Sequence, residues 1–319
     1  MISLPSAQLN LTNNSGLVEA RYQLRLPDIA QSFNGLSLAQ LIARVNLIYR
    51  QCPEAQSWAA SSLALGDCSP ELYRVREQAL ALEWLSEHSW QMWRLAHDWL
   101  GPDKARMQLL SRWRAELLSR KQALPDKRWL VNDRVQACSL APLLDWQQQW
   151  RELVYQPLLE QSESDQLNGL FQPEFEAVAR YETGSLVRVG GADGSFSARL
   201  TSLWDEAWLA SAALCDSGVL PELNPVRGLV KAARGQLQHS GHWRNQASLK
   251  AGQQVSDYRI EIPTKSILQS LCHSLSGLEW SSLFANQLLL NQWLLSHSPC
   301  LEVNVQWSSE VTDSNTKLG

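Results

Sequence analysis

Two of the six cysteines lie where thiolate chemistry is favoured. Cys52 lies where one predicted helix ends and the next begins, and Cys300 follows the last predicted helix. The unsatisfied amides of a helix N-terminus lower the pKa of a thiol, and the thiolate is the form that binds metal ions. Each of the two is therefore a candidate metal ligand, with a structural role as the alternative. The other cysteines are read as ordinary core or near-surface residues: Cys68, Cys138, Cys215 and Cys272.

Common catalytic and binding motifs do not occur in the sequence. It has no glycine-rich phosphate loop, no paired-cysteine zinc site and no two histidines four residues apart. The glycine-rich run Gly190–Gly194 does not follow a strand and open a helix, so it is read as a turn. A net charge of −4 gives no basic surface for nucleic acid. The chemistry must therefore come from single residues in their local context.

Two segments resemble the metal-binding motifs of [NiFe]-hydrogenase large subunits. The segment around Cys52 is similar to the N-terminal motif Cys-x-x-Cys-(Pro)-x-Ala-His, and Cys52, Pro53 and Ala55 match its second half. The segment around Cys300 is similar to the C-terminal motif Asp-Pro-Cys-x-x-Cys-x-x-His, and Pro299 and Cys300 match it. The resemblance implies that these two cysteines are the metal ligands of this chain.

Two further matches lie between the cysteines, in the order that the family has them. Lys231–His239 is similar to Glu-Ala-Pro-Arg-Gly-x-Leu-x-His, with Arg234 in the arginine position. Tyr258–Thr264 is similar to the strand that ends in Pro-Thr or Pro-Ser near the active-site iron, with Thr264 at its end. The four segments span residues 49–306, which is most of the chain. The fold that the resemblance implies is a helical large-subunit core with a small sheet.

The chain departs from the family at the nickel ligands. Tyr49 and Val303 stand where the family has the second cysteine of each pair, and neither is a soft ligand. Gln56 and Gln306 stand where the family has histidine. The resemblance, with these departures, implies that nickel has no site and that the chain turns over no hydrogen. We therefore do not expect an enzyme.

The residues that remain fit an Fe(CN)₂(CO) fragment. The resemblance implies Cys52 and Cys300 as iron ligands, and Arg234 and Thr264 as donors to the cyanides. An arginine offers charge-assisted hydrogen bonds to cyanide nitrogen. Thr264 offers a hydroxyl and a backbone N–H. The alternatives are a surface or sheet-edge arginine for Arg234 and a helix N-cap after Pro263 for Thr264.

This pattern resembles the large-subunit-like accessory proteins of hydrogenase maturation, of the HupK or HoxV type. The resemblance implies a scaffold or carrier that takes a transient Fe(CN)₂(CO) fragment from the HypC–HypD pair and passes it to the hydrogenase large subunit precursor. The alternative is a metal-free interaction chaperone that mimics the large subunit and organises the maturation partners. A residual enzyme ranks below both, because the nickel ligands are missing.

The periodicity predicts a mainly α protein with a small β insert, as one domain over residues 1–306 with a polar tail over residues 307–319. Apolar residues recur at three- and four-residue steps from Ser37 onward, which indicates amphipathic helices. Residues 1–30 alternate weakly, as in a short strand or extended arm. Short segments between residues 228 and 262 predict a small sheet. Helices are expected at residues 37–52, 54–65, 71–100, 104–122, 141–162, 173–181, 200–215 and 279–295, and a loop or hairpin at residues 183–197.

Composition narrows the class of protein. No stretch reads as a secretory signal or is apolar for long enough to span a bilayer, so a cytoplasmic protein with reduced thiols and no membrane insertion is expected. Tryptophan is abundant, at 15 residues. These side chains fill the core, or some of them anchor a partner surface. The sequence leaves both uses open.

Overall fold

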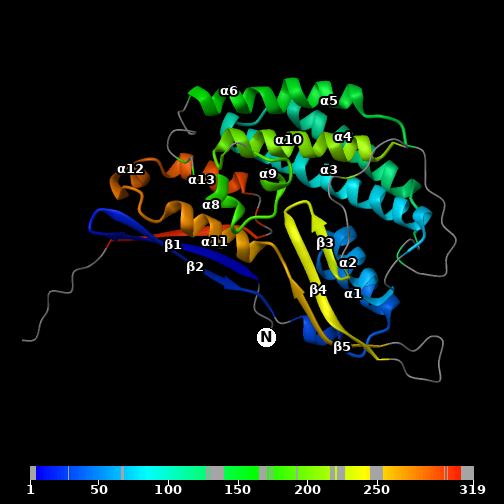
Figure 1. The fold of residues 1–319 in the computed structure, drawn as a ribbon. Coiled ribbons are helices and arrows are strands. Elements are labelled where there is room, and N and C mark those ends of the chain that lie inside the picture. The colour runs from blue at the N-terminus through cyan, green and yellow to red at the C-terminus, as the bar shows by residue number, and fades with distance from the viewer. Residues whose placement is uncertain are drawn as a thin grey trace, which may run out of the picture.

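The computed structural model describes residues 5–27, 29–65, 68–126, 129, 140–164, 171, 173, 175–191, 193–215, 220, 227–244, 254–297, 299 and 301–309. These residues form a mainly helical protein with two three-stranded sheets, which confirms the predicted fold class (Figure 1). None of the described helices is both long enough and apolar enough to cross a membrane.

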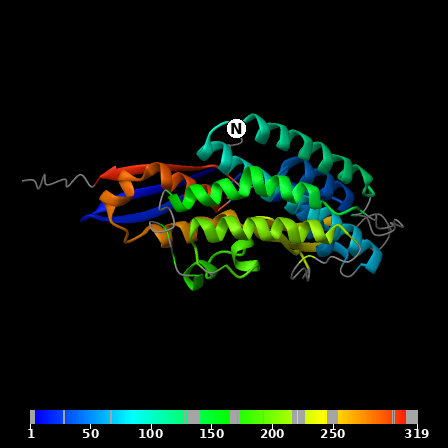
Figure 2. The same ribbon diagram turned by 90° about the horizontal axis from the view of Figure 1, so that it is seen from above.

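One layer of the molecule consists of helices that run alongside one another (Figures 1 and 2). They are α3 (Pro70–Leu100), α4 (Lys104–Ala123), α5 (Leu144–Trp150), α6 (Gln156–Ser164) and α10 (Phe196–Ala213). The Ser69 side chain accepts a hydrogen bond from the Leu72 amide and starts α3, and Gly101, with a φ of 81°, ends it. The π-helical residues Arg151–Tyr155 (η2) join α5 to α6, so the helix expected at residues 141–162 forms with a change of winding inside it.

A second layer combines two helices with the sheet that the sequence predicts. It contains α1 (Leu38–Ile48), α2 (Pro53–Leu65) and the antiparallel strands β3 (Leu229–Ala232), β4 (Gly235–Arg244) and β5 (Gln254–Glu261), in the order β3-β4-β5. Ser37 and Gln40 form a capping box at the start of α1, the helix expected to begin near residue 37. Helix α2 packs on β3 and β4, which brings the Cys52 segment next to the turn that carries Arg234.

The two ends of the described chain meet in another sheet. Strand β1 (Ser6–Asn14) lies between β2 (Leu17–Arg25), which is antiparallel to it, and β6 (Val303–Ser309), which is parallel to it. Helix α11 (Thr264–Leu275) packs against β2. The boundary expected at residue 306 falls inside β6, because Val305 and Trp307 continue the strand opposite Leu9 and Leu11. Residues 310–319 of the expected polar tail lie outside the described residues.

Four segments differ from the expected helices and loops. The expected loop at residues 183–197 holds α9 (Ser185–Arg188) and, at its end, the start of α10 at Phe196, because Ser195 caps that helix. The expected helix at residues 279–295 is two helices, α12 (Trp280–Ala285) and α13 (Gln287–Ser296), with Asn286 between them. Residues 30–33 form a 3-10 helix, η1, and residues 175–179 form α8.

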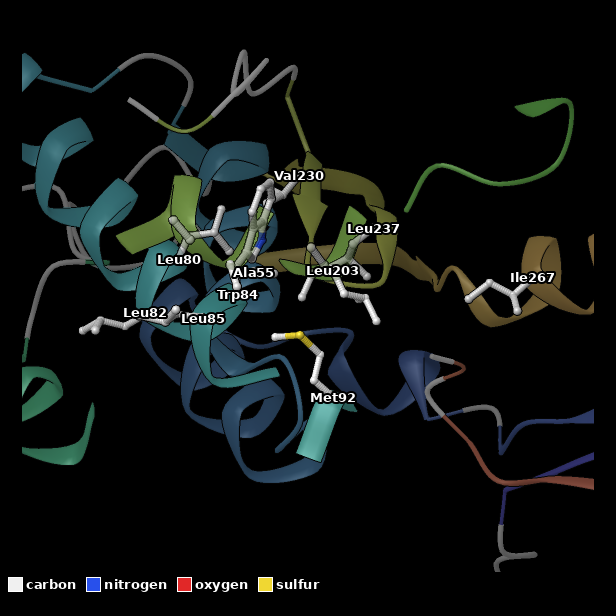
Figure 3. Packing of buried hydrophobic residues seen from close by; sticks show 14 of the residues in the cluster. Ala55, Leu80, Leu82, Trp84, Leu85, Met92, Leu203, Val230, Leu237 and Ile267 are labelled. Atoms are coloured by element: carbon white, nitrogen blue, oxygen red, sulfur yellow. The ribbon is translucent and has the colours of Figure 1, made fainter. Parts of the chain in front are cut away.

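Tryptophan side chains fill much of the core. The fully buried ones include Trp58, Trp84, Trp113, Trp150 and Trp293, which supports the core use of this residue. Figure 3 shows the Trp84 side chain of α3 with those of Ala55 from α2 and Val230 from β3. The Trp84 indole also donates to the Lys231 carbonyl, at 3.2 Å. A single side chain thus ties the helical layer to the sheet beside it.

Gly228, at the start of β3, offers a test of how closely β3 packs against β4. Its φ is +79°, and a Cβ added there would lie 2.1 Å from the carbonyl oxygen of His239. We expect Gly228→Ala to lower the free energy of unfolding by about 3 kcal/mol or more, from backbone strain plus steric overlap. Gly277 is the matched control, because its φ is +89° and nothing lies within 4 Å of such a Cβ. Gly277→Ala should lose only the strain, about 1–2 kcal/mol, in the same urea titration; equal losses would contradict the packing described here.

Candidate functional site

A cavity of about 570 Å³ lies where the four motif segments come together. The α1–α2 junction, the β3–β4 turn and the residue before α11 all contribute to its wall, and so does Leu301. Its lining is mostly leucine, isoleucine, alanine and proline, with a few polar groups: Tyr49, Arg50, Gln51, Cys52, Glu87 and Arg234. An apolar pocket with a small number of polar groups is the usual form of a ligand site, and this volume is typical of one.

Cys52 lies immediately before α2, in the wall of this cavity. Its thiol is half-buried, and the Gln56 side-chain amide donates to its Sγ at 3.7 Å. Glu83 of α3 accepts from the first amides of α2, those of Glu54 (2.6 Å) and Ala55 (3.2 Å). Burial, and then the neighbouring Glu54 carboxylate, raise the pKa of Glu83 well above its ordinary value. The helix end that carries the thiol is therefore anchored to the helical layer by a buried carboxyl group.

A buried chain of hydrogen bonds continues from Gln56 into the sheet. The Gln56 side-chain oxygen lies 2.7 Å from His239 Nε2, and the Tyr258 hydroxyl lies 2.5 Å from His239 Nδ1. Burial lowers the pKa of His239 to about 3, so the ring is neutral. Nε2 then donates to Gln56 and Nδ1 accepts from Tyr258, which leaves the Gln56 NH₂ group to face the thiol. With both ring nitrogens bonded, His239 acts as a structural support for Gln56.

Arg234 lies in the two-residue turn between β3 and β4, and its side chain is 12% exposed. Its Nη2 lies 2.5 Å from Glu87 Oε2, and its Nη1 donates to the Pro299 carbonyl at 2.6 Å. The arginine therefore joins the turn to α3 and to the residue that precedes Cys300. This position differs from the exposed sheet-edge alternative, since the side chain is enclosed and paired with a carboxylate.

Thr264 is the first residue of α11, and Pro263, which lines the cavity, occupies the N-cap position. Thr264 is therefore not the N-cap of this helix, because that position belongs to the residue before it. Thr264 is 0% exposed, and its hydroxyl oxygen has no hydrogen-bond partner among the described residues. A buried hydroxyl without a partner is costly, but Thr264 itself is not among the described residues that line the cavity, which it approaches only through its neighbour Pro263.

The last predicted site residue, Cys300, lies outside the described residues, as does Ser298. Its two neighbours in sequence are both at the site: Pro299 accepts the bond from Arg234, and Leu301 lines the same cavity as Cys52. The expectation that the sulfurs of Cys52 and Cys300 share one ligand site stays a prediction. Among the residues that the structure describes, no three His, Cys, Asp or Glu side chains form a group that could hold a metal ion.

Tyr49 and Val303, which stand in the places of two family cysteines, lie near the site, whereas Gln306 does not line either cavity. Tyr49 lines the cavity, and burial and then Cys52 raise the pKa of its hydroxyl to about 12. Val303 lines a neighbouring cavity of about 300 Å³, which shares Gln51, Arg234 and Leu301 with the first. Gln306 is exposed on β6, where it pairs with Asn10. Tyr49 and Val303 have no thiol, so neither offers a thiolate to a metal ion at neutral pH.

Two charged residues of the cavity were not predicted from the sequence. Glu87 pairs with Arg234, and Arg50, which is exposed, lies in the cavity wall beside Tyr49. Arg50 could have been suspected from its place two residues before Cys52. Glu87 carries no local signal, because its partner is 147 residues away in sequence.

Comparison with solved structures decides the fold. The chain matches the Ni-Fe-Se hydrogenase from D. vulgaris Hildenborough in the as-isolated oxidized state with a TM-score of 0.57 and 13% identity, covering 93% of this chain and 98% of that one. The fold is that of a hydrogenase large subunit.

Two other structures agree with this large-subunit-like fold. The reduced, active Ni-Fe-Se hydrogenase from Desulfomicrobium baculatum matches with a TM-score of 0.56 and 13% identity, over 91% of this chain and 95% of that one. An NAD+-reducing [NiFe]-hydrogenase matches with a TM-score of 0.52 and 14% identity, over 94% and 99%. No family model and no curated protein matches the chain. At 13–14% sequence identity, the similarity to these structures shows the fold alone.

Proposed function

We propose that this protein is a hydrogenase maturation factor that holds an Fe(CN)₂(CO) fragment as a scaffold or carrier. The observation that supports this most is the meeting of four motif segments at one cavity of about 570 Å³: Cys52, Arg234, Pro263 next to Thr264, and Leu301 next to Cys300 all reach it. These segments lie far apart in sequence, so their convergence is a property of the fold.

The chemistry of the donors suits such a fragment. A thiolate is a soft ligand for iron, and Cys52 would supply one, with Cys300 as the expected second. Cyanide nitrogens are acceptors, and Arg234 and Thr264 would donate to them. The Thr264 hydroxyl has no hydrogen-bond partner among the described residues, so a cyanide nitrogen that reached it from beside Pro263 would satisfy it, although Thr264 itself does not line the cavity. The apolar remainder of the wall would keep water away from the iron.

The proposal excludes nickel and hydrogen turnover. Nickel in the related enzymes would need the two thiolates whose places Tyr49 and Val303 take. The fragment is cargo: it would arrive from a scaffold of the HypC–HypD type and leave for the hydrogenase large subunit precursor. A large-subunit-like fold gives such a carrier the means to present the fragment in the surroundings it will later occupy.

Infrared spectroscopy with an iron determination tests this proposal. Protein purified from a hydrogenase-producing cell is expected to show cyanide and carbonyl stretching bands together with about one iron per chain. Protein from the same cell lacking the maturation machinery is the control and should show no bands. Bands that are absent from protein purified without oxygen would count against the carrier.

The second candidate is the metal-free interaction chaperone. One observation favours it: exposed apolar side chains occur at the cavity, with Leu26 and Ile48 in its wall at 44% and 39% exposed, and Leu47, beside Ile48 in sequence, is 64% exposed. Arg234 is also already paired with Glu87. A chaperone would form a complex with the large subunit precursor whether or not iron and cyanide are present, whereas a carrier would depend on them.

Thr264→Val separates a ligand role from a structural one. Valine has nearly the same shape but no hydroxyl, so the buried oxygen without a partner is removed. We expect the free energy of unfolding of the empty protein to rise by about 1 kcal/mol, since an unsatisfied buried group is lost. Retention of the fragment after gel filtration should fall about fivefold, because one hydrogen bond is lost. The control is Ser266→Ala, because the Ser266 hydroxyl donates to the Pro263 carbonyl. If the Thr264→Val protein holds the fragment as well as this control does, Thr264 is not a donor to the fragment.

A further inference from the structure

Behind the turn that carries Arg234 lies a buried guanidinium, that of Arg188, with a side chain 3% exposed. It binds both carboxylate oxygens of Glu206, at 2.5 and 2.6 Å. It also donates to the carbonyls of Thr183 (2.8 Å), Ala232 (3.1 Å) and Ala233 (2.9 Å). A guanidinium has five N–H donors in a planar fork, so these bonds use every one of them.

Three successive carbonyls before Arg234 are thus held by side chains. Trp84 binds the Lys231 carbonyl, and Arg188 binds the next two. The Arg188 guanidinium also lies 4.5 Å from the centre of the Trp84 ring, a cation–π contact. After the turn, the Gln236 amide donates to the Thr183 hydroxyl at 2.7 Å. Residues 231–236 are therefore fixed on both sides of Arg234.

Stability alone is a weak reason for such a cluster. A buried ion pair often contributes no more to stability than apolar residues of the same size, because desolvation offsets the attraction. Glu206 is 0% exposed, and it also bonds to His88 at 2.7 Å. The distinctive feature here is the set of backbone carbonyls, which apolar residues could not bind. Arg188 and Glu206 are not among the described residues that line the 570 Å³ cavity.

We infer that Arg188, oriented by Glu206, is a positioning residue that fixes the β3–β4 turn and so sets the direction of Arg234 toward the cavity. The part of this inference that concerns Arg234 and the fragment rests on the proposed function. The mechanical part concerns the empty protein alone. The planar guanidinium cannot turn while Glu206 holds two of its nitrogens, so the carbonyls that it binds stay in place.

Hydrogen exchange on the empty protein tests the mechanical part. Arg188→Lys keeps the charge but offers three donors in place of five. We expect the amides of residues 230–236 to exchange at least tenfold faster than in the wild type. The matched control is Arg199→Lys, since Arg199 is equally buried and binds both oxygens of Glu182 at 2.8 Å, but makes no hydrogen bond to residues 231–236 within the described part of the chain. It should leave exchange at residues 230–236 unchanged.

A second variant guards against failure of the first to fold. Arg188→Met combined with Glu206→Gln removes the clamp without leaving a buried charge unpaired, and it should show the same faster exchange. In protein that carries the fragment, Arg188→Lys should also shift the cyanide stretching bands, whereas Arg199→Lys should not. Exchange at residues 230–236 that matches the wild type in both Arg188 variants would overturn the inference. Wild-type protein without cyanide bands would overturn the proposed function instead, so the two failures are distinguishable.

Discussion

Cys52→Ala is expected to reduce bound iron and the cyanide and carbonyl bands to background. Cys52 is the thiol that the structure places in the cavity wall, with Gln56 facing its sulfur. Four-ligand zinc sites bind with about 10–16 kcal/mol, so the loss of one ligand is on the order of 3 kcal/mol, or a hundredfold in retention. The measurement is iron per chain and infrared band area after gel filtration, together with maturation of the hydrogenase in a strain that carries the variant.

Cys272→Ala is the matched control for this experiment. Cys272 is also half-buried, but it lies on α11 away from the cavity wall, and burial raises the pKa of its thiol to about 11. Its replacement should leave retention near the wild-type level. Cys300→Ala should resemble Cys52→Ala, and Arg234→Ala should follow with a ten- to hundredfold loss, roughly one hydrogen bond to a charged group. Cysteine variants that mature hydrogenase as well as Cys272→Ala does would show that the thiols are not ligands and would favour the chaperone.

The parts of the fold that were predictable are those with local signals. Helix α1 begins at Leu38 because the side chain of Ser37 caps its first turn, and α3 ends at Leu100 because Gly101 after it adopts a positive φ. The sheet at residues 228–262 has short strands between turn residues. Strand β6 has no such signal, because it is held by parallel pairing with β1, about 296 residues earlier in the chain. Long-range pairing of this kind leaves little trace in a local window.

The same distinction holds for the site. Cys52, Arg234 and Thr264 were found because short motifs surround them, and the structure places Cys52 and Arg234 in one cavity wall and Thr264 directly after Pro263, which belongs to that wall. Their supporting partners were not found. Gln56 and His239 are 183 residues apart, and Arg188 and Ala233 are 45 apart. These pairs depend on how α2, β4 and α9 pack, so only the structure gives them.

Lowering the pH is expected to destabilise the protein already at pH values well above the pKa values of ordinary carboxylates. Burial lowers the pKa of His239 to about 3, and burial followed by Arg199 lowers that of His297 to about 3, although Glu182 opposes it. Both rings bind protons near pH 6.5 only in the unfolded chain. The unfolded state therefore binds more protons than the folded state between about pH 6.5 and pH 3, and stability falls as pH falls through that window.

Two buried carboxylates add to this loss at lower pH. Burial alone would raise the pKa of Glu182 and of Glu206, but Arg199 and Arg188 respectively outweigh it and hold each near 2. Their folded-state pKa values lie below the ordinary 4.5, so their contribution is complete above pH 4.5 and is lost as pH falls toward 2. The carboxylates therefore matter below the range in which the histidines act.

From pH 7.5 to pH 5.5 the two histidines should together lower the free energy of unfolding by about 3 kcal/mol, roughly 1.4 kcal/mol each. Urea titrations at pH 7.5, 6.5 and 5.5 measure this directly, with intrinsic tryptophan fluorescence as the signal. His239→Gln is expected to be less stable at pH 7.5, because the bond from Tyr258 is changed, yet to lose only about half as much on acidification. His297→Gln should give a similar reduction. A wild-type stability that stays constant over this range, or a His239→Gln protein with an unchanged slope, would show that these rings are protonated in the folded state and that the Gln56–His239–Tyr258 chain is not arranged as described.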